Sequence, residues 1–236
     1  MSISENIVSI RARMDDAAIA AGRDPDSVLL CAATKMNDTA AVRQAIAAGV
    51  DVCGENKVQE LTQKLSEHAY DGCPVHFIGH LQTNKVSKVV GKVDLIQSVD
   101  SLHLLQAIQK EAAKQGIRQD ILLQINIGEE ASKSGFACGE VQEILEKMSD
   151  FPNIQVCGLM AIPPICQNPG DNNKFFQEIC NLSVDIMAKK YDNVSVNVLS
   201  MGMSDDYADA ISCGSTMIRV GTAIFGARDY AKNHQN

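Results

Sequence analysis

Two short apolar runs near the end of the sequence finish in small residues that suit an anion. The first run ends at Ser200, and the second continues past Arg219 into Gly221 and Thr222. Small residues let backbone N–H groups approach an anion closely, and Ser and Thr hydroxyls add further donors. Arg219 lies two residues before Gly221, so on a strand both residues face the same side. This spacing predicts a phosphate site with one cation pointing into it.

A second reactive group, the amine of Lys35, ends the buried run Val28–Lys35. Cys31 and Ala33 share its face of the predicted strand, and their small side chains leave room around the lysine stem. Partial burial and a neighbouring Arg219 both favour the neutral amine, which is the form that attacks a carbonyl carbon to make a Schiff base. A strand-end lysine that points into solvent is the alternative, and the spacing alone does not decide between the two.

The elements that must position these residues alternate along the chain. Apolar runs predict strands over Val28–Lys35, Val50–Asn56, Val75–Leu81, Asp94–Val99, Ile121–Ile127, Ile154–Ile162, and in the two runs that end at Ser200 and before Gly221. Helical spacing and caps predict helices over Ser4–Ala21, Asp38–Ala48, Val58–Ala69, Lys85–Val90, Leu102–Gln115, Gly139–Ser149, Asn173–Lys190 and Ser204–Cys213.

Strict alternation of strands and helices indicates parallel βαβ units. About eight such units in 236 residues favour a single (β/α)8 TIM barrel with an extra N-terminal helix, and an open doubly wound sheet is the alternative. The chain shows no linker composition, so we expect one domain over residues 1–236. In such a barrel the functional residues gather at the carboxyl ends of the strands.

Composition narrows the class of partner. The net charge of −8 argues against a nucleic-acid or anionic-membrane surface, because both require basic patches. No apolar run approaches the roughly 20 residues of a membrane span, and the charged N-terminus is unlike a signal peptide. Eight scattered cysteines without a Cys-x-x-Cys motif indicate reduced thiols in a cytoplasmic protein.

Other chemistry-bearing residues carry weaker predictions. His76 and His80 share one strand face, but two histidines without a third ligand make a poor zinc site, and hydrogen-bonded packing is the simpler interpretation. Asp205, Asp206 and Asp209 suit the positive end of the helix that follows them better than a magnesium site. Lys133 follows the fifth predicted strand and either overlooks the same end of the barrel or lies exposed in a loop.

Longer motifs of this sequence resemble the pyridoxal phosphate homeostasis protein family. They keep one order along the chain and occur between about Glu5 and Tyr230. The matching segments are Ala33–Lys35, Gly54–Asn56, His76–Lys85, Asn126–Ile127, Ser132–Gly135, Gly158–Pro163, Leu199–Asp206 and Gly214–Gly226.

The resemblance implies a barrel similar to the N-terminal domain of bacterial alanine racemase, with pyridoxal 5′-phosphate bound to a lysine. The residues that match the family's cofactor contacts are Lys35 for the Schiff base, Asn56 near the ring, Ser200, Gly221 and Thr222 for the phosphate, and Arg219 for the pyridine nitrogen. Met36 and Asn37 follow the lysine where the family often has another lysine or a proline, so no second-lysine role is implied there.

Together, the residues and the resemblance predict a protein that holds, buffers and delivers pyridoxal phosphate rather than an enzyme. Arg219 does not give up its proton, so the pyridine nitrogen stays unprotonated and the ring is a weak electron sink. This disfavours most pyridoxal chemistry, although racemases of this barrel type manage with the same arrangement. Racemases of this barrel type also use a tyrosine base from a second domain, which we do not expect in a chain that ends at Asn236.

Two enzymatic alternatives remain at this point. One is an amino-acid racemase of restricted scope, and the other is a phosphosugar aldolase or isomerase that uses Lys35 without a cofactor. For the carrier we expect a monomer whose partners are pyridoxal phosphate and the apo-enzymes that receive it, with no nucleic acid and no membrane.

Overall fold

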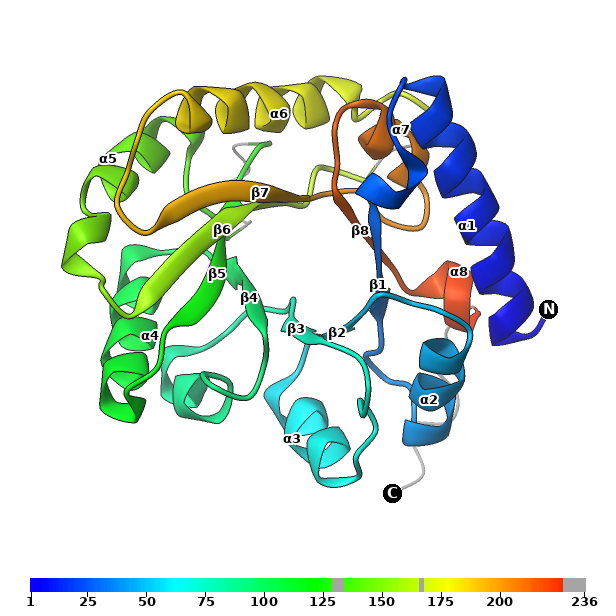
Figure 1. Cartoon of the computed structure of the whole chain (residues 1–236), viewed down its shortest axis with the longest axis horizontal. Coiled ribbons are helices and arrows are strands. Elements are labelled where there is room, and N and C mark those ends of the chain that lie inside the picture. Colours follow the sequence, from blue (N-terminus) through cyan, green and yellow to red (C-terminus); the bar gives the residue numbers. More distant parts are fainter. Residues whose placement is uncertain (129–133, 166–167, 227–236) are drawn as a thin grey trace.

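The computed structural model describes residues 1–128, 134–165 and 168–226, and in that part of the chain eight parallel strands form a closed barrel (Figure 1). The strands are β1 (Leu29–Ala33), β2 (Val52–Glu55), β3 (Val75–Phe77), β4 (Leu95–Val99), β5 (Gln119–Ile125), β6 (Ile154–Ala161), β7 (Val194–Ser200) and β8 (Met217–Val220). They pair in sequence order, and β8 closes the barrel by pairing with β1. This confirms the predicted α/β barrel and excludes the open sheet.

Helices surround the barrel on the outside (Figure 1). The α-helices are α1 (Ile3–Ala20), α2 (Thr39–Ala47), α3 (Val58–Ser66), α4 (Leu102–Gln115), α5 (Val141–Glu146), α6 (Asn173–Met187), α7 (Tyr207–Ser212) and α8 (Thr222–Phe225). The described residues also include four 3-10 turns, η1 (Pro25–Ser27), η2 (Thr83–Lys88), η3 (Cys138–Glu140) and η4 (Met148–Asp150). Across the described residues, no helix combines the length and apolar character needed to cross a membrane.

The extra helix α1 covers the side of the barrel where β8 meets β1. Ser2 caps it in a reciprocal capping box with Glu5, which satisfies N–H groups that the first helical turn leaves free. Its buried residues Ile7, Ile10 and Met14 recur at helical spacing, and α1 lies against α7 and α8 (Figure 1). The N-terminal helix therefore seals the junction that brings the first and last strands together.

Each strand has one face toward the helices and one toward the barrel interior. On β1, Leu30 and Ala32 join the large core under the helices, whereas Cys31 and Ala33 join a small interior cluster with Met217. This alternation is the two-residue period of a strand. It confirms that the face of β1 assigned to Lys35 points into the barrel.

Several predicted boundaries are confirmed and others are wrong. Helix α4 has the predicted range and ends at Gly116 in the left-handed conformation, and Asp38 caps α2 as expected. The third strand ends at Phe77 rather than Leu81, because the backbone of Gly79 packs on Asn56, where an added Cβ would lie 2.1 Å from the carbonyl oxygen of Asn56.

Two predicted helices also differ from the structure. The segment Lys85–Val90 lies mostly in the 3-10 turn η2, and helix α5 is short and flanked by the turns η3 and η4. Helix α7 begins at Tyr207 rather than after Ser204. The reason is that the Asp206 carboxylate accepts the N–H of Met203 at 2.7 Å and holds residues 203–206 in a turn before the helix.

Candidate functional site

Barrel closure brings the predicted lysine and the predicted anion site to neighbouring strand ends. In the register between β1 and β8, Cys31 lies opposite Arg219, so Lys35 and Gly221 both follow directly at the carboxyl end of the barrel. An added Cβ at Gly221 would lie 3.3 Å from the Cβ of Ala33, closer than most real contacts of this kind. The glycine therefore lets the two strand ends approach each other closely.

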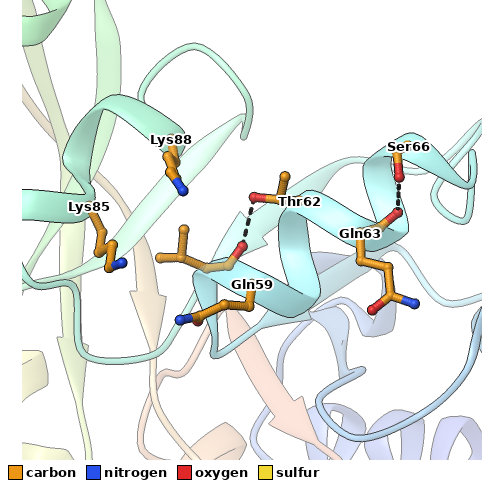
Figure 2. Close-up of a pocket in the computed structure, with 7 residues that line it drawn as sticks. Gln59, Thr62, Gln63, Ser66, Lys85 and Lys88 are labelled. Atoms are coloured by element: carbon orange, nitrogen blue, oxygen red, sulfur yellow. Dashed lines mark hydrogen bonds between the residues drawn. The ribbon is translucent and has the colours of Figure 1, made fainter.

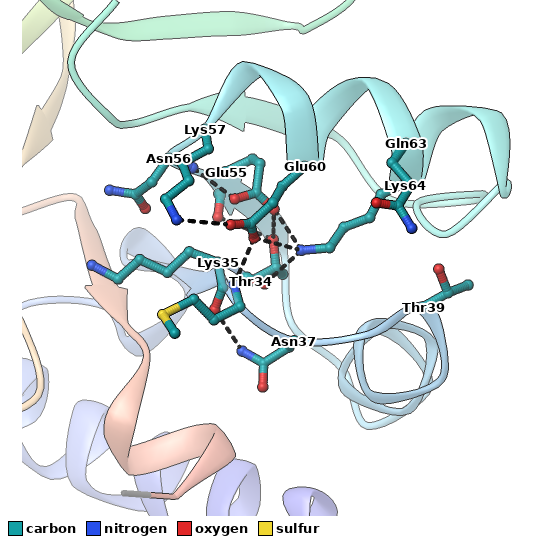
Figure 3. A network of polar contacts seen from close by, with 12 residues as sticks. Thr34, Lys35, Asn37, Thr39, Glu55, Asn56, Lys57, Glu60, Gln63 and Lys64 are labelled. Carbon is teal, nitrogen blue, oxygen red and sulfur yellow. Dashed lines mark hydrogen bonds and ion pairs between the residues drawn. The ribbon is translucent and has the colours of Figure 1, made fainter. Parts of the chain in front are cut away.

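Lys35 is half-buried and lies just beyond the end of β1, in a segment whose backbone is constrained. Met36, the next residue, has φ of +62°, a left-handed conformation that residues other than glycine adopt uncommonly. In Figure 3 the Lys35 side chain extends away from Glu55, Glu60 and Lys64. The choice between an amine over the barrel and a strand-end lysine that points into solvent stays a prediction.

Asn56 follows β2 on the other side of β1. Its side chain ends on the same side as that of Lys35 (Figure 3). The Oδ1 atom of Asn56 is buried, and no hydrogen-bond partner for it lies within the described parts of the chain. Because buried polar atoms are normally satisfied, this oxygen marks a place where a ligand donor fits.

Arg219 lies inside the barrel, with only 5% of its surface exposed. Its Nη1 donates to Ser200 Oγ at 2.6 Å, and its Nη2 donates to the carbonyl oxygen of Ala161 at 2.9 Å. Burial lowers the pKa of Arg219 to about 10, so the guanidinium remains a cation at neutral pH. These two hydrogen bonds fix the plane of the Arg219 guanidinium. Because a guanidinium carries five N–H donors, some of them remain for a ligand.

The Arg219 contact continues into a chain of buried hydrogen bonds that the sequence did not indicate. Ser200 Oγ donates to Gln97 Oε1 at 2.6 Å, and Gln97 Nε2 lies 2.9 Å from Nδ1 of His76. Burial lowers the pKa of His76 to about 4, so its imidazole is neutral at pH 7. The predicted hydrogen-bonded packing of His76 is therefore confirmed, and Gln97 is the residue that joins it to Ser200.

A cysteine beneath the site is also uncharged. Cys31 lies in the interior cluster next to β8, and burial raises the pKa of its thiol to about 12. The cation of Arg219 acts in the opposite direction but does not outweigh burial. At neutral pH the interior near Arg219 therefore contains a neutral thiol and a neutral imidazole beside one buried guanidinium.

The remaining anion-site residues lie where the strands end. Gly221 precedes α8, and Thr222 is exposed as the first residue of that helix. The hydroxyl of Ser200, in contrast, is already held between Arg219 and Gln97. The structure therefore brings all six predicted residues to one end of the barrel, and phosphate contacts by Ser200, Gly221 and Thr222 stay predictions.

Other candidates from the sequence do not join this site. His80 lies beyond the end of β3 and pairs with Asp100 at 3.1 Å on the surface, so it does not share a strand face with His76. Within the described residues no group of three or more His, Cys, Asp or Glu side chains could hold a metal ion. Asp206 and Asp209 accept backbone N–H groups of Met203 and Gly170 rather than only facing solvent. Lys133 lies outside the described residues.

A separate groove of about 380 Å³ lies on the outside of the barrel, between α3 and η2 (Figure 2). Lys85 and Lys88 face Gln59 across it, and Thr62 and Ser66 give their hydroxyls to backbone carbonyls of α3. The residues that line this groove do not include any of the six predicted site residues. It is therefore distinct from the site at the strand ends.

Comparison with known proteins identifies the family. The family described as "Alanine racemase, N-terminal domain" matches residues 3–229. A pyridoxal phosphate homeostasis protein of Aquifex aeolicus is 39% identical over 98% of this chain and 100% of its own length. A protein of the same name from Pseudomonas aeruginosa is 40% identical over 97% of both chains. The chain belongs to the pyridoxal phosphate homeostasis protein family.

Solved structures of similar proteins agree with this assignment. PipY of Synechococcus elongatus, solved without pyridoxal phosphate, has a TM-score of 0.84 and 32% identity over 95% of this chain and all of PipY. PipY has also been solved with pyridoxal phosphate bound, and that structure has a TM-score of 0.82. An alanine racemase of Clostridium difficile is only 15% identical and this chain covers 58% of it, so that likeness shows the fold alone.

Proposed function

We propose that this member of the pyridoxal phosphate homeostasis family binds pyridoxal 5′-phosphate at the strand ends and holds it as a Schiff base on Lys35. In this role it buffers and delivers the cofactor without appreciable turnover. The observation that carries the proposal is the meeting of Lys35, the buried Arg219 cation and the unsatisfied Asn56 oxygen at one end of the barrel. The relatives' names and the PipY structure with bound cofactor support the same ligand.

The donor set fits the chemical groups of this cofactor. We place the phosphate between Gly221, Thr222 and Ser200, the pyridine nitrogen against Arg219, and the ring beside Asn56. Backbone N–H groups and hydroxyls are suitable partners for a phosphate dianion, and a guanidinium N–H is a suitable donor to a neutral ring nitrogen. The chain's own contribution is thus to orient the aldehyde toward the amine of Lys35.

The bound cofactor supplies an aldehyde, and the Lys35 nitrogen forms a C=N bond to its carbon while the aldehyde oxygen leaves as water. Arg219 donates an N–H to the pyridine nitrogen and keeps its proton, because its pKa of about 10 lies well above neutral pH. A ring nitrogen without a proton stabilises a neighbouring carbanion poorly. This arrangement disfavours most carbanion chemistry of the cofactor. Because racemases of this barrel type use the same arrangement, exchange at Cα of amino acids decides between a carrier and a racemase.

The setting of the carrier follows from the same observations. The buried cysteines Cys31 and Cys53 form no disulfide, which supports a reducing compartment such as the cytoplasm. We propose that one barrel domain acts as a monomer and that apo-enzymes that use pyridoxal phosphate are its recipients. Sedimentation of the loaded protein tests the monomer, and transfer of cofactor to a purified apo-enzyme tests the delivery.

The decisive experiment combines a visible absorbance spectrum with borohydride reduction of the loaded protein. Reduction should attach a pyridoxyl group, and peptide mass spectrometry should place it on Lys35, whereas a Lys35→Arg variant should stay unlabelled. Label confined to another lysine would overturn the assignment. Deuterium exchange at Cα of common amino acids at about 1 s⁻¹ or faster would instead support a racemase.

A further inference from the structure

A buried ion pair lies directly behind Lys35 and is not explained by cofactor contacts. Glu55, the last residue of β2, is fully buried, and its Oε2 accepts from Lys64 Nζ of α3 at 2.7 Å (Figure 3). Only 6% of the Lys64 side chain is exposed. Lysine is almost never buried to this degree without a specific partner.

The Glu55 carboxylate is saturated with donors. Besides Lys64, its Oε2 accepts from the hydroxyls of Thr34 and Tyr70, each at 3.1 Å, and its Oε1 accepts from the N–H of Asn56 at 2.8 Å. Burial raises the pKa of Tyr70, so its hydroxyl remains a donor at neutral pH. Replacing a buried ion pair by apolar side chains is often neutral or stabilising, so stability alone does not account for this arrangement.

The same side chains hold the backbone on both sides of Lys35. Lys64 Nζ donates to the carbonyl oxygen of Thr34, the residue before Lys35, at 2.7 Å. Glu60 lies one helical turn before Lys64. It accepts the N–H of Met36, the residue after Lys35, at 2.6 Å. Glu60 also lies 3.6 Å from Lys64, so the two arms are linked.

The held segment includes Met36, a residue with a strained backbone. Met36 has the left-handed φ of +62°, which persists only where surrounding contacts enforce it. The Glu60 contact to the Met36 N–H supplies such an enforcing contact. Figure 3 shows the Lys35 side chain leaving this network on the opposite side from Lys64.

We propose that Thr34, Glu55, Glu60, Lys64 and Tyr70 form a Lys35 clamp, whose function is to aim the Lys35 amine at the aldehyde of the cofactor. The inference rests on the proposed function and deepens it, because it names the residues that position the reactive lysine. The clamp residues act as positioning residues through the backbone of Thr34 and Met36 on either side of Lys35. A displacement of the Lys35 amine by about 1 Å from its productive position should lower the rate of its reaction with the aldehyde on the order of 100-fold.

The test uses a variant that removes the clamp's charges without leaving a buried ion unpaired. The double variant Glu55→Leu with Lys64→Met should fold, because both charges are removed together. Its stability should lie below that of the wild type, because the Tyr70 hydroxyl and the Asn56 N–H lose their acceptor. The matched control is Glu143→Leu with Lys147→Met, which removes an exposed pair of the same residue types at the end of α5, joined at 2.6 Å.

Two ligands separate positioning of the lysine from general damage to the site. Pyridoxine 5′-phosphate has the ring and the phosphate but no aldehyde. The double variant should therefore bind it with the same affinity as the wild type does. The rate at which pyridoxal 5′-phosphate forms the borohydride-reducible bond to Lys35 should fall at least about tenfold in the double variant. The control variant should keep the wild-type rate.

The results that overturn the clamp are distinct from those that overturn the proposed function. A stable double variant that is labelled at the wild-type rate, or that loses affinity equally for both ligands, would overturn the clamp. A wild-type chain that is not labelled at Lys35 would overturn the proposed function and the clamp with it. If the double variant fails to fold, Glu60→Gln, which leaves the buried pair intact, is judged by the same rate measurement.

Discussion

Ser200 offers a sharp test of how the site is built, because its hydroxyl has two possible roles. The resemblance assigns it to the phosphate, whereas the structure places it between Arg219 and Gln97 at 2.6 Å from each. All three residues are buried. The variant Ser200→Ala removes the acceptor for the Arg219 cation and leaves the Gln97 oxygen without its donor.

The loss of stability in Ser200→Ala follows from the two hydrogen bonds that the variant lacks. A hydrogen bond to a charged group contributes about 1.5–3 kcal/mol, and a buried acceptor left unsatisfied costs about 1 kcal/mol or more. We therefore expect the free energy of unfolding of Ser200→Ala to fall by about 3 kcal/mol. Ser98→Ala is the matched control, since Ser98 is also a buried serine but donates to the neutral carbonyl of Gly79, and its loss should cost about 1 kcal/mol.

The assay is urea unfolding of the ligand-free proteins, followed by affinity measurements for pyridoxal phosphate and pyridoxal. Equal losses of stability in Ser200→Ala and Ser98→Ala would refute the charge-assisted bond to Arg219. If Ser200 acts through Arg219, both ligands should weaken by the same factor, about tenfold for each 1.4 kcal/mol lost. If its hydroxyl instead contacts the phosphate, only pyridoxal phosphate should weaken.

Three further predictions address the phosphate, the guanidinium and the buried imidazole. Pyridoxal should bind about 100-fold or more weakly than pyridoxal phosphate, because at least two charge-assisted hydrogen bonds are lost, and similar dissociation constants in a titration would contradict a phosphate site. Arg219→Glu should raise Cα deuterium exchange of bound amino acids at matched cofactor occupancy, since a carboxylate favours a protonated ring nitrogen; unchanged exchange would remove Arg219 as the cause of inactivity. His76 has a pKa of about 4 in the fold against about 6.5 when unfolded, so the unfolded chain binds more protons between these values. The free energy of unfolding should therefore fall by about 3 kcal/mol from pH 7 to pH 4, and His76→Gln should flatten that slope in urea titrations at both pH values.

Local sequence patterns were sufficient for most of the elements. The range Leu102–Gln115 predicted for α4 is confirmed, and the structure shows local signals at both ends of it, the Ser101 cap and the Gly116 terminus. The alternation of such segments predicted the barrel. Where the prediction was wrong, as at the end of β3, a contact with another strand decided the boundary, and Gly79 carried no local signal of its close approach to Asn56.

The six site residues could be predicted by type and position, but their neighbours could not. Gln97 is one of two adjacent polar residues in the strand Leu95–Val99, and it enters the barrel interior beside a register shift between Ile96 and Val99. That shift puts both Ile96 and Val99 in the core under the helices, which strict alternation would not allow. A pattern read with period two therefore cannot tell which of these side chains reaches Ser200.

By itself, the sequence determined the order of strands and helices, the identity of the reactive groups and the family. The reason is that the periodicity of apolar residues and the motifs are properties of short segments. Only the tertiary structure decided which groups meet. Pairing of β8 with β1 places Arg219 beside Cys31 across 188 positions of sequence, and α3 carries Lys64 back against Thr34. Such contacts depend on barrel closure and strand register, which no local stretch of residues encodes.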